Sequence, residues 1–200
     1  MTPAVLRSRL AEIAAEPIGE SVVYGTDVLA TLSNPLIPAA VLVPVVLGET
    51  PGILLTKRTA HLSAHAGQVS FPGGRIDPGD SGPEAAALRE AREEIGLDPA
   101  FVEVLGRMPD YVTGTGYRIT PVLAVLPPGL RYRISPHEVD SIFELPIGVV
   151  LDPNAPRLQR QHVRGVWRQY WVWPHPEQFI WGATAAILVR LAERLRERIG

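Results

Sequence analysis

The sequence predicts an α/β fold in which helices cover the faces of a mixed β-sheet. Short apolar runs of strand length recur through the middle of the chain, and amphipathic helical patterns precede, interrupt and follow them. The 200 residues contain neither a repeat nor a low-complexity tract, and they suffice for a sizeable core. We therefore expect residues 1–200 to form a single domain.

The first expected elements are a helix and two strands. Residues 3–16 carry apolar side chains at helical spacing and stop before Pro17, which predicts an amphipathic helix that packs on the main body. The runs "IPAAVLVPVVLGE" and "GILLTKRT" predict two buried strands joined by a turn at residues 49–52. The segment "GQVSF" favours a third, short strand.

A second helix is expected from Pro83 to just before Gly96, after the loop "FPGGRIDPGDSG". Proline at the first helical position and glycine just past the end are favourable start and stop residues. At about 100° per residue the helix has an apolar side and an opposite acidic side. These sides consist of Leu88, Ala91 and Ile95, and of Glu90, Glu93 and Glu94. We expect the acidic side to face outward.

Strand patterns continue after this helix. They lie in "FVEVLGRMPD", "YRITPVLAVLPP", "SIFELPI" and "VRGVWRQYWVW". Gly114 and Gly116 lack the strand-then-helix setting of a dinucleotide-binding loop, so we expect turn glycines beside a pocket. A last helix, at residues 180–199, has its apolar face formed by Ile187, Leu188, Leu191 and Leu195.

Three carboxylates on one helix face have two interpretations. Like charges at this spacing cost only about 0.2–0.5 kcal/mol per pair, so "REAREE" alone is compatible with an ordinary solvated face. The other interpretation is a cation site, because Mg²⁺ prefers carboxylate oxygens together with waters and substrate phosphates. Gly73 and Gly74 favour the cation, since glycines permit a close backbone approach that brings a carbonyl ligand to the same ion.

Composition narrows the classes of partner and compartment. With 19 Lys and Arg against 21 Asp and Glu, the charge balance gives no electrostatic case for a nucleic-acid-binding surface. The absence of cysteine excludes disulfides, thiolate metal sites and cysteine nucleophiles. No apolar run is long enough to span a bilayer, and the first residues mix Arg with Glu instead of forming a signal peptide. We therefore expect a cytoplasmic protein without a membrane partner.

The segment "GGRIDPGDSGPEAAALREAREEIGL" resembles the Nudix box, which runs Gly, five residues, Glu, seven residues, Arg-Glu-U-x-Glu-Glu-x-Gly-U, where U is aliphatic. Residues 89–97 match the second half in order, with Ala91 as a small aliphatic residue. The first half departs from the pattern, because Asp80 replaces Glu and eight residues separate it from Arg89. This departure puts a role of the first acid in doubt.

The same departure is usual in the coenzyme A pyrophosphatase branch of the family. The upstream segment "LLTKRTAHLSAHAGQVSFPGG" is similar to a second signature of that branch, although Ser63 occupies one familiar basic position. Together the two motifs span residues 54–97. The resemblance implies a Nudix fold, which is an α/β/α sandwich around a mixed sheet, and hydrolysis of coenzyme A to adenosine 3′,5′-bisphosphate and 4′-phosphopantetheine.

The resemblance also implies a set of site residues. The cation, Mg²⁺ or Mn²⁺, would be held by Glu90, Glu93, Glu94 and the carbonyl of Gly73. Catalytic roles would belong to Glu90, to Arg89 as a brace for the acids, and to a later acid, with Glu138 as the first choice and Glu144 as the second. Substrate contacts are expected from Lys57, Arg58, His65, Gln68, Arg75 and Arg118.

Several alternatives remain open. ADP-ribose, a dinucleoside polyphosphate or a nucleoside triphosphate would suit the same box, since specificity lies outside it. A non-catalytic nucleotide-binding module is the more distant alternative, and a homodimer is plausible. We do not expect His61 and His65 to form a zinc site, because the H-E-x-x-H pattern is absent and no third ligand is evident. Tyr170 and the tryptophans Trp167, Trp171 and Trp173 favour core or dimer contacts over stacking on adenine.

Overall fold

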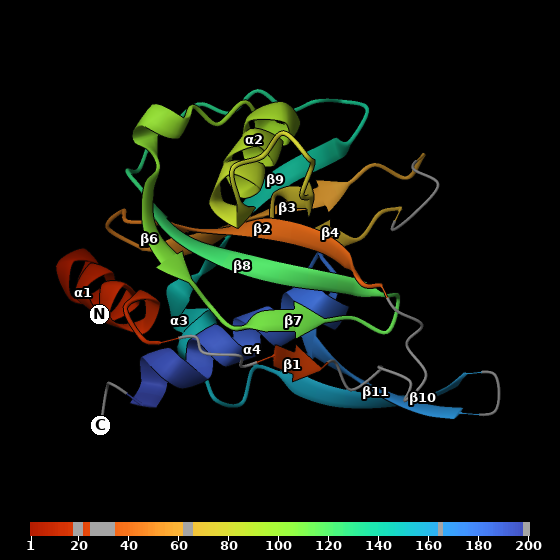
Figure 1. Ribbon diagram of the computed structural model, residues 1–200. Coiled ribbons are helices and arrows are strands. Elements are labelled where there is room, and N and C mark those ends of the chain that lie inside the picture. The colour runs from red at the N-terminus through yellow and green to blue at the C-terminus, as the bar shows by residue number, and fades with distance from the viewer. Residues whose placement is uncertain (18–21, 25–34, 62–65, 164–165, 198–200) are drawn as a thin grey trace.

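The structure is a computed structural model that describes residues 1–17, 22–24, 35–61, 66–163 and 166–197 (Figure 1). Ser63 and His65, both singled out in the upstream motif, lie outside the described residues. In the described part of the chain, no helix is long and apolar enough to cross a membrane.

The centre of the molecule is a nine-stranded mixed sheet. Its main path runs β1 (Val22–Tyr24), β7 (Asp110–Val112), β8 (Tyr117–Leu126), β2 (Ile37–Val46), β3 (Gly52–Arg58) and β4 (Val69–Ser70). Off this path, β5 (Gly73–Arg75) pairs with β2, β6 (Glu103–Arg107) with β8, and β9 (Val139–Pro146) with β3. The pairs β1/β7 and β2/β8 are parallel and the other pairs are antiparallel, which confirms the mixed sheet.

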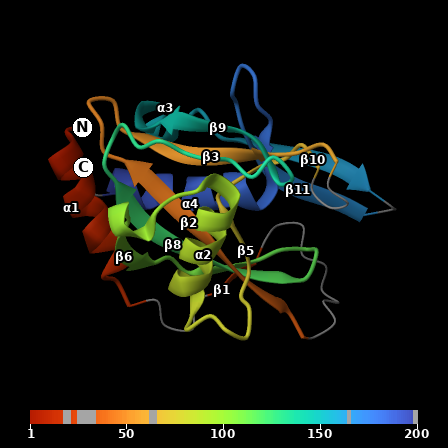
Figure 2. The ribbon, with the colours of Figure 1, turned by 90° about the horizontal axis from the view of Figure 1, so that it is seen from above.

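Helices cover both faces of this sheet. Helix α2 (Pro83–Ile95) lies on one face, and α1 (Pro3–Ala14) and α4 (Gly182–Glu197) lie on the other (Figures 1 and 2). Alternation along the central strands supplies both cores, since Leu42 packs with the α2 side and Val43 with the α4 side. The expected α/β architecture is therefore present.

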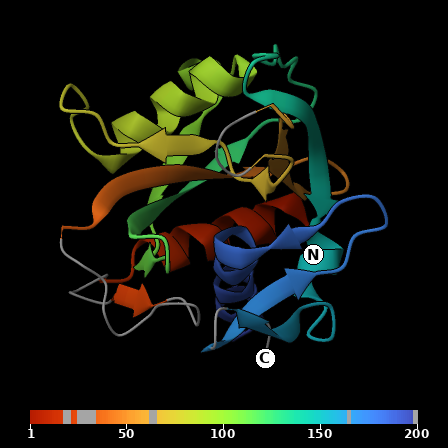
Figure 3. The same cartoon turned by 90° about the vertical axis from the view of Figure 1, so that its right-hand side faces the viewer.

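A second, three-stranded sheet packs beside α4 (Figure 3). It contains β10 (Arg157–Val163), β11 (Val166–Trp173) and β12 (Ile180–Trp181), which pair antiparallel. Trp173 is fully buried and Trp171 packs against the same core, as expected, whereas Trp167 is 69% exposed.

The ends of the expected helices differ in detail. Helix α1 ends at Ala14, and α4 begins at Gly182, because Ile180 and Trp181 pair with β11 as a strand. A short helix, α3 (Ile147–Leu151), and a 3-10 turn, Pro99–Phe101, were not expected from the sequence. The position of α2 on the sheet is what sets the geometry of the acidic residues described next.

Candidate active site

Helix α2 begins and ends where the sequence indicates. Pro83 opens it, and Gly96 follows its last residue in a left-handed conformation with φ 65°. In its first turn, Glu84 pairs with Arg107 of β6, which ties the start of the helix to the sheet. The acids further along α2 are thus presented from a fixed element.

Gly73 and Gly74, before α2, each lie so close to another part of the molecule that a side chain there would clash. A Cβ atom on Gly73 would lie 2.4 Å from the carbonyl oxygen of Ala40 and 2.6 Å from the Cα atom of Val41, because β5 runs directly alongside β2. A Cβ atom on Gly74 would lie 2.5 Å from Oε1 of Glu90. Gly73 therefore permits the strand pairing, and Gly74 makes room for a carboxylate.

Glu94 is buried, which corrects the expectation that all three acids of α2 face outward. Its side chain is 2% exposed, because it shares the inner helix face with Ala87 and Ala91. One oxygen accepts from the N–H of Gly73 at 3.1 Å, and the other accepts from Arg58 at 3.2 Å. Burial raises the pKa of Glu94 to about 7, although the Gly73 N–H and Arg58 both act to lower it. The negative charges of Glu90 and Glu138 add to the rise.

Arg89 holds the outer acids in place, and Asp80 holds Arg89. The guanidinium donates to both oxygens of Asp80 at 3.0 Å, to Glu90 at 2.9 Å and to Glu93 at 3.1 Å. It also donates to the carbonyl of Arg75 at 3.1 Å. The arginine lowers the pKa of the Asp80 carboxyl, with help from the N–H of Asp77. The acid that departs from the Nudix pattern is thus a bidentate partner of the box arginine.

Glu90 and Glu138 complete the acidic end of the site. Burial raises the pKa of Glu90, opposed by Arg89 and reinforced by Glu93 and Glu138. Glu138 arrives from the loop between β8 and β9. That loop is fixed to the chain just after β3, because the N–H of Thr59 donates to the carbonyl of Glu138 at 3.0 Å. The N–H of Ser135 donates to the carbonyl of Glu94 at 2.8 Å, which fixes the loop to α2 as well.

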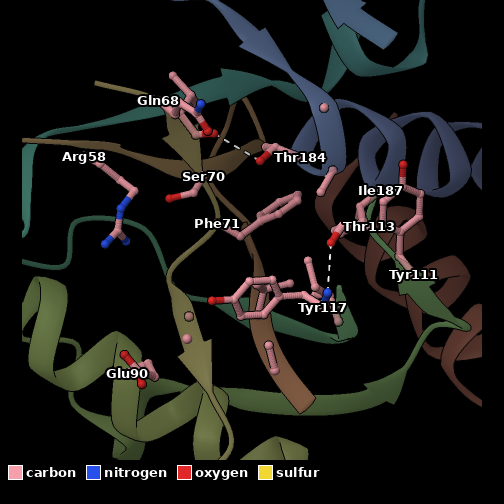
Figure 4. Close-up of a pocket in the computed structure, with 18 of the residues that line it drawn as sticks. Arg58, Gln68, Ser70, Phe71, Glu90, Tyr111, Thr113, Tyr117, Thr184 and Ile187 are labelled. Atoms are coloured by element: carbon pink, nitrogen blue, oxygen red, sulfur yellow. Dashed lines mark hydrogen bonds between the residues drawn. The ribbon is translucent and has the colours of Figure 1, made fainter. Parts of the chain in front are cut away.

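These acids line one cavity of about 570 Å³ between α2, the sheet and the start of α4. Arg58 and Glu90 lie on one side of Phe71, and Thr184, Ile187 and Thr113 lie on the other (Figure 4). Of the expected site residues, the cavity collects Arg58, Gln68, Gly73, Arg75, Glu90, Glu94 and Glu138.

Other expected site residues lie elsewhere. Glu93 is 57% exposed, Arg118 of β8 pairs with Asp110, and neither lines the cavity. Lys57 is also absent from the lining, because strand alternation directs it to the face opposite Arg58. Glu144, on β9, lies against Gly52 and outside the cavity. The structure thus favours Glu138 over Glu144 as the nearby acid.

The cavity also contains residues that sequence reasoning missed. The hydroxyl of Tyr117 accepts a hydrogen bond from Arg75 at 3.2 Å. The central carbon of the Arg75 guanidinium lies 5.8 Å from the centre of the Tyr117 ring. Trp181 comes from β12 and Thr184 from the start of α4, and both are more than eighty residues from the box. Strand and helix patterns give no signal for such long-range contributions to a pocket.

The donors of the acidic end fit a hard divalent cation in kind. Glu90, Glu94 and Glu138 line one cavity. Burial raises the pKa of Glu90 and of Glu94, and repulsion from Glu138 adds to both rises. Among the described residues, no three acidic or histidine side chains stand close enough together to hold an ion. Mg²⁺ usually binds one or two carboxylates together with waters and substrate phosphates, so it needs no cage of three side chains.

Comparisons with known proteins agree with this site. Residues 36–189 match the NUDIX domain family. The uncharacterized Nudix hydrolase NudL of Escherichia coli (strain K12) is 45% identical over 159 residues, which cover 77% of this chain and 80% of that protein. A NudL protein of Shigella boydii matches to the same extent.

Solved structures share the fold at low sequence identity. The NUDIX domain of Shewanella oneidensis NrtR, complexed with ADP ribose, has a TM-score of 0.51 at 19% identity and covers 84% of this chain and 91% of that one. A C. elegans Ap4A hydrolase has a TM-score of 0.50 at 17% identity and covers 80% of this chain and 95% of that one. The family match, the identity to NudL and the intact acidic helix together assign the chain to the Nudix family, as a hydrolase that cleaves a diphosphate bond.

Proposed function

We propose that this Nudix hydrolase cleaves the diphosphate bond of coenzyme A or its derivatives, giving adenosine 3′,5′-bisphosphate and 4′-phosphopantetheine. The observation that carries the proposal is the joining of the two motifs in one cavity. Arg58, Gln68 and Phe71 of the upstream segment line the same space as Glu90 and Glu94 of the box. A site that used the box alone would have no need of the upstream side chains.

Nudix hydrolases generally use divalent metal ions, and Mg²⁺ or Mn²⁺ is the proposed cofactor here. Glu90 and Glu94 would hold it, with Glu138 and the carbonyl of Gly73 as further donors. The bound cation would neutralise the diphosphate and lower the pKa of a water ligand. Glu93, which pairs with Arg89 at 3.1 Å, remains a predicted ligand of the same cation.

The chain's own residues account for the remaining roles. Glu90, with its raised pKa, is suited to take a proton from the attacking water. Arg89 positions that carboxylate at 2.9 Å, and Asp80 fixes Arg89 from the other side. Glu138 is proposed as a second acid that faces the reacting groups.

Cationic side chains would hold the substrate. Arg58 and Arg75 line the cavity and would donate to phosphate oxygens, and Gln68 would contact the same region. Lys57, His65 and Arg118 remain predicted substrate contacts, of which Lys57 and Arg118 require a substrate that extends beyond the cavity.

ADP-ribose is the alternative substrate, because the NrtR domain that shares the fold was solved with that ligand. The test is chromatography of products after incubation of the purified protein with Mg²⁺ or Mn²⁺ and, in separate reactions, coenzyme A, ADP-ribose and a diadenosine polyphosphate. Adenosine 3′,5′-bisphosphate formed only from coenzyme A and only with metal is the expected result. Cleavage of ADP-ribose with coenzyme A left intact would overturn the proposed substrate and retain the reaction.

A further inference from the structure

Aromatic residues form part of the cavity wall. Trp181 lines the cavity and is partly exposed, together with Tyr117. The chain's other tryptophans are arranged differently, since Trp173 is fully buried, Trp171 packs in the core and Trp167 is 69% exposed outside the cavity. Trp181 is therefore the one tryptophan of the four that lines the described cavity.

The indole of Trp181 is held in a fixed orientation. Its strand pairs with β11, which sets Trp181 opposite Val172. The ring centre of Tyr170 lies 5.6 Å away at an angle of 71°, and that of Phe179 lies 6.2 Å away. Gly182 follows with φ 64°, so the chain turns sharply into α4 directly after the indole. A ring braced in this way offers a rigid surface and loses little conformational freedom on binding.

Other groups that line the cavity suit a flat ligand with polar edges. The hydroxyls of Thr113 and Thr115 lie 2.9 Å apart, and both residues line the cavity. Tyr117 adds a phenol group. A nucleobase has aromatic faces that stack on indole and edges that hydrogen-bond to hydroxyls, whereas a flexible apolar chain would use only the ring surface.

We propose, on the basis of the proposed function, that the substrate's nucleobase stacks on the indole of Trp181. This contact sets the affinity for the nucleotide half of the substrate. The diphosphate then lies toward Arg58 and the acids, and the moiety beyond it points away from Trp181. Tyr170 is a positioning residue in this arrangement, because it contacts Trp181 and does not line the cavity.

Titration with AMP, followed by tryptophan fluorescence, tests this without turnover. AMP should quench the emission of the wild type and of the control Trp167→Phe, and should leave the emission of Trp181→Phe unchanged. In calorimetry, Trp181→Ala should weaken AMP binding about 10-fold, and Trp181→Phe, which keeps a ring, should weaken it less. Ribose 5-phosphate, which lacks the base, should bind the wild type and Trp181→Ala equally.

Three results would overturn the proposal: AMP that does not bind the wild type, wild-type AMP affinity in Trp181→Ala, or quenching by 4′-phosphopantetheine in place of AMP.

The experiments distinguish a failure of the stacking role from a failure of the proposed substrate. Cleavage of coenzyme A with unchanged AMP affinity in Trp181→Ala would remove the stacking role alone. AMP stacking on Trp181 without cleavage of coenzyme A would remove the proposed substrate alone. Thermal melting of Trp181→Ala and Trp181→Phe identifies a variant that fails to fold, and the conservative Trp181→Phe then provides the test.

Discussion

At the scale of single residues, Glu94 combines burial with charge. We predict that Glu94→Gln lowers kcat by about 100-fold or more, because it removes a charge from the proposed cation site. The amide oxygen can still accept from the N–H of Gly73, so the melting temperature should stay close to that of the wild type. Steady-state kinetics measures the change in kcat, and thermal melting measures the change in melting temperature.

The matched control is Glu103→Gln, since Glu103 is an exposed acid that pairs with Arg7 far from the cavity. Near wild-type turnover in Glu94→Gln would refute the assignment.

The adjacent glycines give a second residue-scale prediction, with opposite outcomes for neighbouring positions. Gly74→Ala places its methyl group against the Glu90 carboxylate, which can rotate away, so activity should fall about 10-fold or more with little loss of stability. Gly73→Ala places its methyl group against the backbone of β2, which cannot rotate away, so unfolding should become easier by about 2–3 kcal/mol. Denaturant titration and kinetics separate the two. Equal stability loss in both variants would contradict the distinction.

At the scale of elements, the loop before α2 is fixed by the pair of Asp80 and Arg89. Asp80→Asn should reduce activity about 10-fold, because Arg89 then positions Glu90 less firmly. The control is Asp77→Asn, since Asp77 is 64% exposed and its carboxylate lies 3.7 Å from Arg89. Unchanged activity in Asp80→Asn would show that the other partners of Arg89 suffice.

The same pair predicts a pH dependence of stability. The folded pKa of Asp80 is lowered, so the pair stabilises the protein above the unfolded pKa and this contribution is lost as the pH falls through the folded value. The melting temperatures of the wild type and Asp80→Asn should therefore differ most near neutral pH and converge below about pH 4. A difference that persists or grows in acid would contradict this origin.

The elements also show which parts of the structure local sequence patterns can predict. Helix α2 and the long strands β2, β3 and β8 follow from apolar periodicity and from start and stop residues, and they form as expected. Strands β5 and β12 have only three and two residues, and pairing with distant strands creates them. Trp181 was consequently expected in a helix, and its place in the cavity was missed.

Local sequence patterns likewise predict some features of the site and miss others. The box and the upstream motif predict the identity of the acids and of Arg58, because residue type and spacing carry the chemistry. The burial of Glu94 depends on Gly73 approaching from β5, and the partner of Arg89 depends on a loop with an extra residue. These are contacts between segments, for which helical periodicity gives no information.

At the scale of the whole molecule, the cavity is assembled from parts that are far apart in the sequence. Acids come from α2 and the loop before β9, cations from β3 and β5, and the aromatic wall from β12 and β8. Hydrogen bonds from Ser135 to Glu94 and from Thr59 to Glu138 hold the acidic side together, and Thr184 of α4 donates to the carbonyl of Val69 at 3.1 Å. Ligands that bind across these parts should therefore stabilise the folded molecule as a unit.

A divalent cation gives the whole-molecule prediction. Chelation with EDTA should abolish turnover, and added Mg²⁺ or Mn²⁺ should restore it. Cation binding should also raise the melting temperature, because a ligand that binds only the folded state stabilises it by about 2.7 kcal/mol at a concentration 100 times its Kd. The same cation should shift Glu94→Gln much less, and Glu103→Gln as much as the wild type. Scanning fluorimetry with and without Mg²⁺ measures the three shifts side by side. An equal shift in Glu94→Gln would mean that the cation binds elsewhere, and turnover that persists in EDTA would remove it from the reaction.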